Sequence, residues 1–215
     1  GFMIRAVEKI GCKVTAVTLS KKQYDVCKRK IKEKNLDNKI NLLLMDYRNI
    51  KGKYDKIVSI EMLEAVGYEF LDEYFSKLKT YCKPNGILVI QTISLIKKIH
   101  DKKLKESDFL REYIFPGSNC NSFESISKSA EKFDWNIQDV KEIGLHYAKT
   151  LKMWDVNFMN NKNKIINEGF DENFIRMFHY YFKYCESAFS SRIVKLYQIT
   201  FSTSHNLSYE DKYLL

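Results

Sequence analysis

Short apolar runs alternate with longer amphipathic segments over the first 94 residues, and this alternation constrains the fold more than any other feature of the chain. Segments of helical periodicity precede the first run, continue from Ser20 to about Leu36 and return at 68–81. The apolar runs are short enough for strands and lie at 12–17, 40–45, 54–60 and 87–90. Apolar strands that alternate with helices are typical of a parallel sheet covered on both faces. The sequence therefore predicts an α/β fold with a doubly wound, mostly parallel sheet.

The order of these elements lacks an opening strand. A doubly wound nucleotide-binding fold begins with a strand, a glycine-rich loop and a helix, whereas here Gly1 leads directly into the first helix. We therefore expect the chain to lack its first strand, with Gly1 as the last glycine of a loop that lies upstream. Such a truncated chain should expose the centre of its sheet.

The second half differs in character and predicts a helical cap. Residues 95–120 are polar and loop-rich, apart from a short helix near 107–113, and the segment Pro84-Asn85-Gly86 predicts a turn before this half begins. Aromatic residues concentrate in two long helical segments. The expected elements are helices at 122–133, 146–161 and 171–190, and strands at 136–143 and 193–202. We expect residues 1–215 to form a single domain, in which 95–190 contain the aromatic-rich helical cap that covers the substrate.

Composition narrows the classes of protein. The chain has 215 residues, of which 45% are hydrophobic and only 2 are proline, so a packed core is expected and disorder is not. No apolar run approaches the roughly 18 residues that a membrane span needs. The 5 cysteines form no CxxC pair, which favours reduced thiols in the cytoplasm over disulfides, and no spacing suggests a metal site.

The net charge of +9 permits a nucleic acid, an anionic membrane surface or an acidic substrate as partner. No segment resembles a nucleic-acid recognition motif, so we expect no nucleic acid. Much of the charge comes from lysines on solvated faces, but a basic face directed at phospholipid headgroups remains compatible with the sequence.

The residues that directly follow the four predicted strands are the candidates for a binding site, because ligands of open α/β sheets bind beyond the carboxyl ends of the strands. All four exits are polar, although a purely structural sheet would share this property. The exits are Thr18-Leu19-Ser20, Asp46-Tyr47-Arg48, Glu61-Met62-Leu63-Glu64 and Gln91-Thr92-Ile93-Ser94. We expect Thr18, Asp46, Glu64 and Gln91 to surround one cleft.

Two segments together resemble the class I methyltransferases that use S-adenosylmethionine. The stretch from Tyr54 to Glu61, followed by Glu64-Ala65-Val66-Gly67, is similar to the strand that ends beneath the transferred methyl group. The stretch from Lys83 to Leu88 resembles the LKPGG turn of the same class. The resemblance implies a Rossmann-like fold and S-adenosyl-L-methionine as the cofactor.

Within that class, an ordered series of motifs resembles the cyclopropane-fatty-acyl-phospholipid synthases, closer to their plant- and fungal-like branch. The segment Tyr113-Ile114-Phe115-Pro116-Gly117 is more specific than any general methyltransferase motif. The other matching blocks are Val17–Gln23, Asp46-Tyr47-Arg48, Glu64-Ala65-Val66-Gly67, His146-Tyr147 through Thr150-Leu151, Trp154, the helix with Tyr180, Cys185 and Phe189, and Tyr197-Gln198 with Phe201-Ser202. The resemblance covers residues 1 to about 202.

The resemblance implies an enzyme that transfers a methyl(ene) group to the double bond of an unsaturated phospholipid acyl chain and forms a cyclopropane ring. It implies a cytoplasmic protein that associates peripherally with the membrane, and it leaves a homodimer open. One alternative is a lipid or amine methyltransferase on the same scaffold. Another is a non-catalytic, truncated remnant, since a chain without the glycine loop should bind S-adenosylmethionine poorly and be inactive on its own.

The family's cofactor positions correspond to the first two strand exits and the glycine loop. Gly1, as the end of that loop, would lie at the methionyl end of the cofactor. The adenosyl and ribose side would be lined by Thr18, Leu19, Ser20 and Gln23, and the adenine by Asp46 and Tyr47. Ser20 can also be interpreted as a helix N-cap, and Asp46-Tyr47 as a polar turn.

The family's catalytic positions correspond to Glu64, Gln91, Ile93 and Tyr147. The resemblance implies that these residues hold a bicarbonate ion, which takes the proton released as the ring closes. Alternatively, Glu64 is a carboxylate at a helix start and Tyr147 a core phenol.

Three further positions bear on this assignment. Gln91 stands where many bacterial members have histidine, so its amide can hold an anion but cannot carry a proton. Ala65 likewise replaces a common histidine. Glu61 is either a neighbour of the site or the exposed end of a strand.

Overall fold

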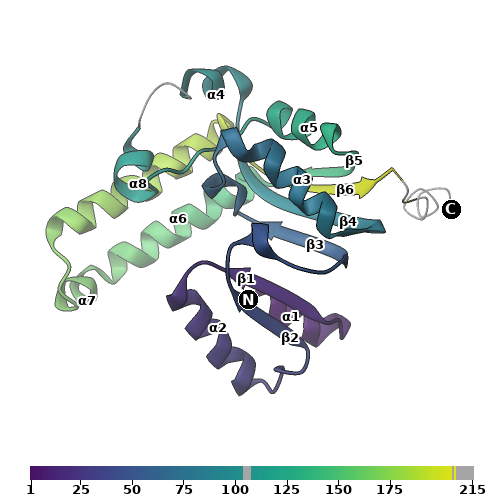
Figure 1. Ribbon diagram of the computed structural model, residues 1–215. Coiled ribbons are helices and arrows are strands. Elements are labelled where there is room, and N and C mark those ends of the chain that lie inside the picture. The colour runs from purple at the N-terminus through teal and green to yellow at the C-terminus, as the bar shows by residue number, and fades with distance from the viewer. Residues whose placement is uncertain (104–107, 205, 207–215) are drawn as a thin grey trace. The chain divides into compact units, whose positions relative to one another are not determined.

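The computed structural model describes residues 1–103, 108–204 and 206 (Figure 1). The chain divides into two compact units, Gly1–Gly52 and Lys53–Leu215. Each unit is described by itself below. The expectation of a single domain stays a prediction, as does the cleft that residues of both units were expected to surround.

The first unit packs two helices against a pair of parallel strands. Ile4 and Val7, three residues apart on one helix face, are buried against Ile31 and Ile40. Val14 lies opposite Ile40 in the strand pair. The elements are α1 (Phe2–Ile10), β1 (Val14–Thr18), α2 (Lys21–Glu33), β2 (Ile40–Leu44) and the 3-10 turn η1 (Tyr47–Asn49). The predicted helix and strands of this region are confirmed.

The second unit contains a four-stranded sheet in the order β3-β4-β6-β5. Strand β4 pairs parallel with β3, whereas β6 pairs antiparallel with both β4 and β5. Three of the four strands therefore run in one direction, and the sheet is mostly parallel. The strands are β3 (Tyr54–Ile60), β4 (Cys82–Leu95), β5 (Trp135–Glu142) and β6 (Val194–Thr203).

Helices cover this sheet and extend beyond it. Helix α3 packs against α5, and α6 packs along α8 (Figure 1). The helices are η2 (Leu63–Ala65), η3 (Tyr68–Phe70), α3 (Leu71–Tyr81), α4 (Lys97–Lys103), the π-helical turn η4 (Leu110–Ile114), α5 (Phe123–Lys132), α6 (Gly144–Asn160), α7 (Lys162–Asn167) and α8 (Glu172–Ser190). The fully buried centre includes Tyr74, Phe75, Leu88, Ile90, Ile199 and Phe201.

Three local predictions for this unit need correction. The turn predicted at Pro84-Asn85-Gly86 does not precede the strand, because β4 already begins at Cys82. These residues form an irregularity inside the strand, where the register with β3 shifts between Tyr54 and Lys56. Gly86 is required there, since a Cβ at this position would lie 2.2 Å from the Cys82 sulfur and 2.9 Å from the Lys83 carbonyl oxygen.

The segment 95–120 is more ordered than the predicted loop. It contains α4 and the π-helical turn η4, whereas the short helix was predicted near 107–113, and residue 107 lies outside the described residues. The predicted helix at 68–81 is divided into η3 and α3. Helix α7 was not predicted, because its six residues are too few to show a clear periodicity.

Helices α6 and α8 form a hairpin rich in aromatic contacts. The rings of Phe170 and Phe174 stack at 4.3 Å between centroids, and Phe178 lies 4.4 Å from Phe174 and 5.9 Å from Phe158. The base of the hairpin joins the sheet through a buried cluster that includes Leu151, Phe182, Phe189 and Leu196. The predicted aromatic-rich helical segment is thus present as a two-helix extension.

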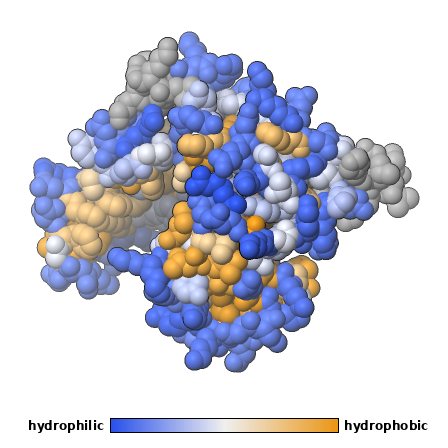
Figure 2. Space-filling view, viewed as in Figure 1, coloured by the Kyte–Doolittle hydropathy of each residue, from blue (hydrophilic) through white to orange (hydrophobic). Residues whose placement is uncertain are grey.

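A buried charge also links the two helices. Asp155 on α6 is 3% exposed, and its carboxylate lies 2.6 Å from Nδ1 of His179 and 3.0 Å from Nζ of Lys183, both on α8. Figure 2 shows that apolar residues also gather on the surface of this hairpin. Trp154, Val156 and Phe170 are between 44% and 49% exposed. Among the described residues, no helix is both long and apolar enough to cross a membrane.

Candidate functional site

Glu64 lies at the carboxyl end of the second unit's sheet, where η2 follows β3 directly. Its Oε1 accepts hydrogen bonds from the backbone N–H of Ile93 at 2.5 Å and from the Thr92 hydroxyl at 3.0 Å. Its Oε2 is buried and has no hydrogen-bond partner in the structure. Burial raises the pKa of this carboxyl, although the bonds from Ile93 and Thr92 lower it. The site therefore offers one satisfied and one unsatisfied carboxylate oxygen.

Gln91 lies on β4 and is held by side chains from two neighbouring strands. Its Nε2 donates to Oε1 of Glu61 at 2.8 Å, and its Oε1 accepts from Nε2 of Gln198 at 2.9 Å. Gln198 is the residue directly opposite Gln91 in the antiparallel β4–β6 pair. The three side chains thus form a continuous chain of hydrogen bonds across the end of the sheet.

Glu61 itself has an unusual backbone conformation. Its φ of 49° is in the left-handed region, which non-glycine residues rarely occupy. In this conformation its backbone N–H donates to the Gln91 carbonyl oxygen at 2.8 Å, directly beyond the last parallel pair of β3 and β4. Glu61 therefore contacts Gln91 through both its main chain and its side chain.

Tyr147 enters the same region from α6. Burial raises the pKa of its phenol to about 12, with further contributions from the charges of Glu61, Cys185 and Glu64. The pKa of Tyr181 on α8 is raised as well, by burial and by the charges of Cys185, Tyr147 and Glu61. Both phenols therefore remain protonated near neutral pH and can donate a hydrogen bond.

The structure brings together the four predicted catalytic positions. Glu64, Gln91 and Ile93 lie at the end of β3 and β4, and Tyr147 is close enough to Glu64 for their charges to interact. The Ile93 N–H, which was expected to contact an anion, donates to Glu64 instead. Sequence reasoning missed Thr92, Tyr181 and the pairing of Gln91 with Gln198. The last was accessible only in part, because Gln198 belongs to a recognised motif but its strand partner cannot be read from periodicity.

The predicted cofactor residues lie in the first unit, and their side chains form two small polar clusters. In the first, the Thr18 hydroxyl donates to Oε1 of Gln23 at 2.9 Å and accepts from the Ser20 N–H at 3.1 Å. Ser20 Oγ accepts from the Gln23 N–H at 3.2 Å, so Ser20 is the N-cap of α2. Leu19 is 72% exposed.

The second cluster follows β2. Asp46 accepts from the backbone N–H of Arg48 at 2.8 Å and from its guanidinium at 3.0 and 2.7 Å. These bonds hold the pKa of Asp46 below its ordinary value. Tyr47 begins the 3-10 turn that Asp46 caps. Gly1 precedes α1, and its carbonyl accepts from the Arg5 N–H at 3.2 Å. The N-cap and turn interpretations of Ser20 and Asp46 are thus real structural roles, which leave a second role in binding untested.

Other features of the described residues do not extend this site. No group of three or more histidine, cysteine, aspartate or glutamate side chains within 1–103, 108–204 and 206 could hold a metal ion. A shallow depression on the surface of α6, lined by Lys149, Lys152, Met153, Val156 and Asn157, contains none of the predicted catalytic residues.

Comparison with known proteins identifies the family. The model of the mycolic acid cyclopropane synthetase family matches residues 1–199. The chain belongs to this family of S-adenosylmethionine-dependent methyltransferases. The resemblance found in the sequence motifs is therefore confirmed.

Two curated relatives are equally similar to this family member. The tuberculostearic acid methyltransferase of Mycobacterium tuberculosis is 33% identical over 198 residues, which are 92% of this chain and 46% of the relative. The cyclopropane-fatty-acyl-phospholipid synthase of Escherichia coli is 33% identical over 189 residues, which are 88% of this chain and 47% of the relative. The chain thus spans slightly less than half the length of either relative.

A solved structure confirms the fold. A mycolic acid cyclopropane synthase complexed with SAH and CTAB superposes with a TM-score of 0.85 at 27% identity, covering 94% of this chain and 73% of that one. The expected α/β class I methyltransferase fold, with a Rossmann-like, mostly parallel sheet, is therefore shown.

Proposed function

We propose that the protein uses S-adenosylmethionine to methylenate the double bond of an unsaturated phospholipid acyl chain. The observation that carries this proposal is the environment of Glu64. A buried carboxylate oxygen without a partner lies near a phenol, at the carboxyl end of the strands where this fold class binds ligands. The equal similarity to a cyclopropane synthase supports the substrate class.

The reaction can be written as a balanced sequence of bond changes. The π electrons of the alkene attack the methyl carbon, a C–C bond forms, and the C–S bond of the sulfonium breaks to release S-adenosylhomocysteine. The adjacent carbon becomes a cation. Loss of one proton from the transferred methyl then supplies the electron pair that closes the ring. The products are the cyclopropane, S-adenosylhomocysteine and one proton, so the site must provide a proton acceptor close to the cation.

The residues around Glu64 fit a bound bicarbonate. When present, bicarbonate would supply the base that receives this proton. The unpartnered Oε2 of Glu64 can bond the hydroxyl of such an ion, and the protonated phenol of Tyr147 can donate to its charged oxygens. Gln91 can donate through its amide but has no proton to exchange. These side chains hold and orient the acceptor, and the Ile93 N–H contributes indirectly by orienting Glu64.

We assign the cofactor to the polar clusters of the first unit, through Gly1, Thr18, Leu19, Ser20, Gln23, Asp46 and Tyr47. The hydroxyl and amide groups near Thr18 have the chemistry that ribose hydroxyls require. The bonds from Arg48 leave Asp46 able to accept from an adenine amino group, because a carboxylate has about four acceptor sites.

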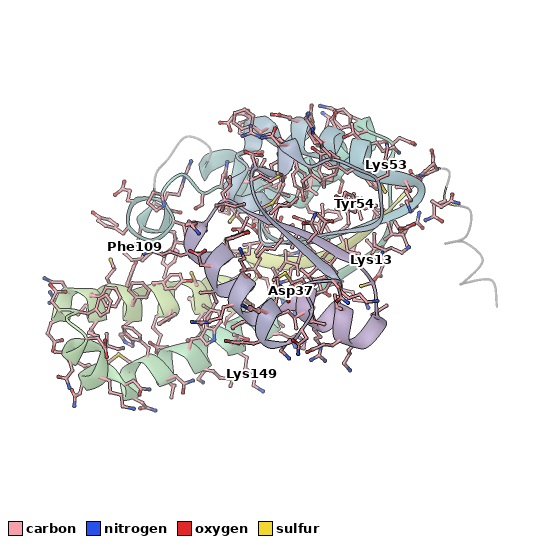
Figure 3. The ribbon with its side chains drawn as sticks, turned by 60° about the horizontal axis from the view of Figure 1, so that its bottom comes forward. Lys13, Asp37, Lys53, Tyr54, Phe109 and Lys149 are labelled. Carbon is pink, nitrogen blue, oxygen red and sulfur yellow. The ribbon has the colours of Figure 1, made fainter. Side chains whose placement is uncertain are left out.

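The α6–α8 hairpin is the part of the protein that we assign to the acyl chain. Its aromatic rings offer an apolar environment, and an aromatic face also tolerates a nearby cation. Figure 3 labels Phe109, whose ring meets that of Tyr180 on α8 edge-on at 4.7 Å. Exposed aromatic side chains such as Tyr113, Phe115 and Tyr180 are suited to the interface of a membrane, so the protein would act as a peripheral membrane enzyme.

A specific observation favours a second candidate. The relative named a methyltransferase is as similar as the one named a cyclopropane synthase, at 33% identity each. A protein that methylates a lipid alkene without closing a ring would share the cofactor and the first bond-forming step. The two candidates differ in which proton leaves the cation.

Trideuterated S-adenosylmethionine distinguishes them. The protein, expressed from its complete reading frame, would be incubated with vesicles of monounsaturated phospholipid, and the fatty acid esters analysed by mass spectrometry. A cyclopropane retains two deuterons, whereas a methylated alkene that loses a chain proton retains three. Absence of any labelled lipid would refute both candidates.

Glu64→Gln tests the role of the carboxylate in the same assay. Because a charge-assisted hydrogen bond is about twice as strong as a neutral one, we expect turnover to fall several-fold to hundreds-fold with the S-adenosylmethionine dissociation constant unchanged. Glu124→Gln, at an exposed position in the first turn of α5, is the matched control. Equal turnover in Glu64→Gln and wild type would reduce Glu64 to a structural carboxylate.

A further inference from the structure

Glu61 was placed by sequence only as a neighbour of the site or the end of a strand, yet the structure ties it to Gln91 at two points. Its backbone N–H donates to the Gln91 carbonyl at 2.8 Å, and its carboxylate accepts from the Gln91 side-chain amide at 2.8 Å. A side chain that follows the last residue of β3 has no need of such contacts for the sheet to form. The pair therefore calls for a role beyond strand pairing.

The two partners of Gln91 fix which way its amide faces. An ionised carboxylate can only accept hydrogen bonds, so the NH2 group of Gln91 must point toward Glu61. On the other side, the NH2 group of Gln198 donates to the Gln91 oxygen at 2.9 Å. A reversed amide would place its oxygen against the carboxylate and its NH2 against another NH2. Both contacts would then be repulsive.

This arrangement makes Gln91 a donor on the side of the candidate site. A primary amide has two N–H bonds, and Glu61 uses one of them. The second N–H shares the orientation that Glu61 imposes. The amide oxygen, which would repel an anion, is directed toward β6 instead.

The backbone of Glu61 provides an independent indication. A left-handed conformation at a residue with a side chain is unfavourable, and it persists at functional sites where surrounding contacts enforce it. Glycine would relieve this conformation but would remove the carboxylate. The charge of Glu61 also contributes to the raised pKa of Tyr147 and of Glu64, so Glu61 is close to both groups.

We propose that Glu61 is a positioning residue, which together with Gln198 locks the side-chain amide of Gln91 with its N–H groups facing the proton-accepting anion. The inference rests on the proposed function, because the anion is the bicarbonate assigned there. Without Glu61 the amide can rotate and present its oxygen. The anion then binds more weakly, and the cation survives long enough to lose a proton of the acyl chain instead.

The first test measures bicarbonate binding without lipid or turnover. In the protein from its complete reading frame, ¹³C-labelled bicarbonate would be titrated against wild type, Glu61→Gln and Glu61→Asp. Glu61→Gln presents either an oxygen or an NH2 to Gln91, so the orientation is no longer forced and affinity should fall roughly three- to tenfold. Glu61→Asp keeps an acceptor and should recover part of this loss. Glu69→Gln, an exposed carboxylate eight residues further along, is the control.

The double variant Glu61→Gln/Gln198→Glu makes the test sharper. It exchanges acceptor and donor on the two sides of Gln91, so the amide should reverse and affinity should fall further than in Glu61→Gln. In the deuterium assay, the share of product with three deuterons should rise in the same order. Bicarbonate affinity that is equal in wild type, Glu61→Gln and the double variant would overturn the inference.

The outcomes also separate this inference from the proposed function. If wild type labels no lipid but binds bicarbonate more tightly than Glu61→Gln, the proposed substrate is wrong and the positioning role stands. If wild type labels lipid and Glu61→Gln matches it in both affinity and product ratio, the function stands and Glu61 is a strand end. Failure of wild type to bind bicarbonate would remove the purpose of the lock and overturn the inference.

Discussion

The carboxylate oxygen Oε1 of Glu64 and the backbone nitrogen of Ile93 are 2.5 Å apart, while the second carboxylate oxygen of Glu64 is buried without a partner. A group in such surroundings affects stability as well as chemistry, because burial raises its pKa above the ordinary 4.5. The native protein therefore binds more protons at this group than the unfolded chain does. Its contribution to stability is fully present below the unfolded pKa and is lost as the pH rises through the folded pKa.

Glu64→Gln should consequently be more stable than wild type at about pH 7, since glutamine carries no charge to bury. Thermal unfolding followed by circular dichroism between about pH 4 and 8 measures the difference in midpoint. The difference should shrink as the pH falls toward the ordinary pKa of a glutamate. Equal midpoints at every pH would show that the carboxyl is not perturbed.

Tyr147→Phe should lower turnover while the protein stays folded. The ring packs edge-on against Trp154 at 5.9 Å and Phe189 at 5.1 Å, contacts that phenylalanine retains. Because the phenol pKa is about 12, Tyr147 acts as a donor, and the wild-type pH–rate profile should show no deprotonation of this group below about pH 10. A loss of about tenfold is expected for one hydrogen bond to a charged acceptor. Unchanged kinetics in Tyr147→Phe would make Tyr147 a core phenol.

Ser20→Ala separates capping from cofactor binding. Loss of the N-cap bond to Gln23 should cost about 1 kcal/mol, measured by urea denaturation. Ser122 caps α5 in the same way, with its Oγ accepting from the Ser125 N–H at 3.1 Å. Ser122→Ala should show a similar stability loss without weakening S-adenosylmethionine binding by calorimetry. If Ser20→Ala also binds the cofactor normally, Ser20 is only a cap.

Asp155→Asn should destabilise the α6–α8 hairpin by about 1.5–3 kcal/mol, because it weakens bonds from His179 and Lys183 to a buried carboxylate. Urea denaturation gives the free energy of unfolding. Asp25→Asn removes the exposed pair with Lys21 on α2 and should cost only about 0.3–0.5 kcal/mol. Equal losses in the two variants would mean that burial adds nothing to the Asp155 contacts.

Periodicity was sufficient to predict most elements and the family motifs were sufficient to predict the class. The strand from Tyr54 to Ile60 and the helix that Ser20 caps follow directly from apolar spacing and capping chemistry. The irregularity at Pro84-Asn85-Gly86 was predicted as a turn because proline and glycine interrupt regular structure. Pairing with β3 on both sides of these residues kept them inside the strand, and no local rule contains that information.

The candidate site divides in the same way. Glu64 and Tyr147 were named by motif, and their burial agrees with that assignment. The hydrogen-bond chain from Gln198 to Glu61 depends on which strands are neighbours, and it joins residues 107 and 30 positions apart in the chain. Sequence patterns identify polar strand exits, but they do not say which exits share a hydrogen bond.

The position of β6 between β4 and β5 also determines when the second unit can fold. Residues 87–95 and 135–142 reach the ribosome exit long before 194–203, yet each strand must wait for β6 to pair with it on that side. Hydrogen bonds between segments so distant in sequence slow folding, because a long loop must close before they form. During synthesis, β4 and β5 are therefore open edges prone to pairing with other chains, and release of the β6 segment ends that vulnerability.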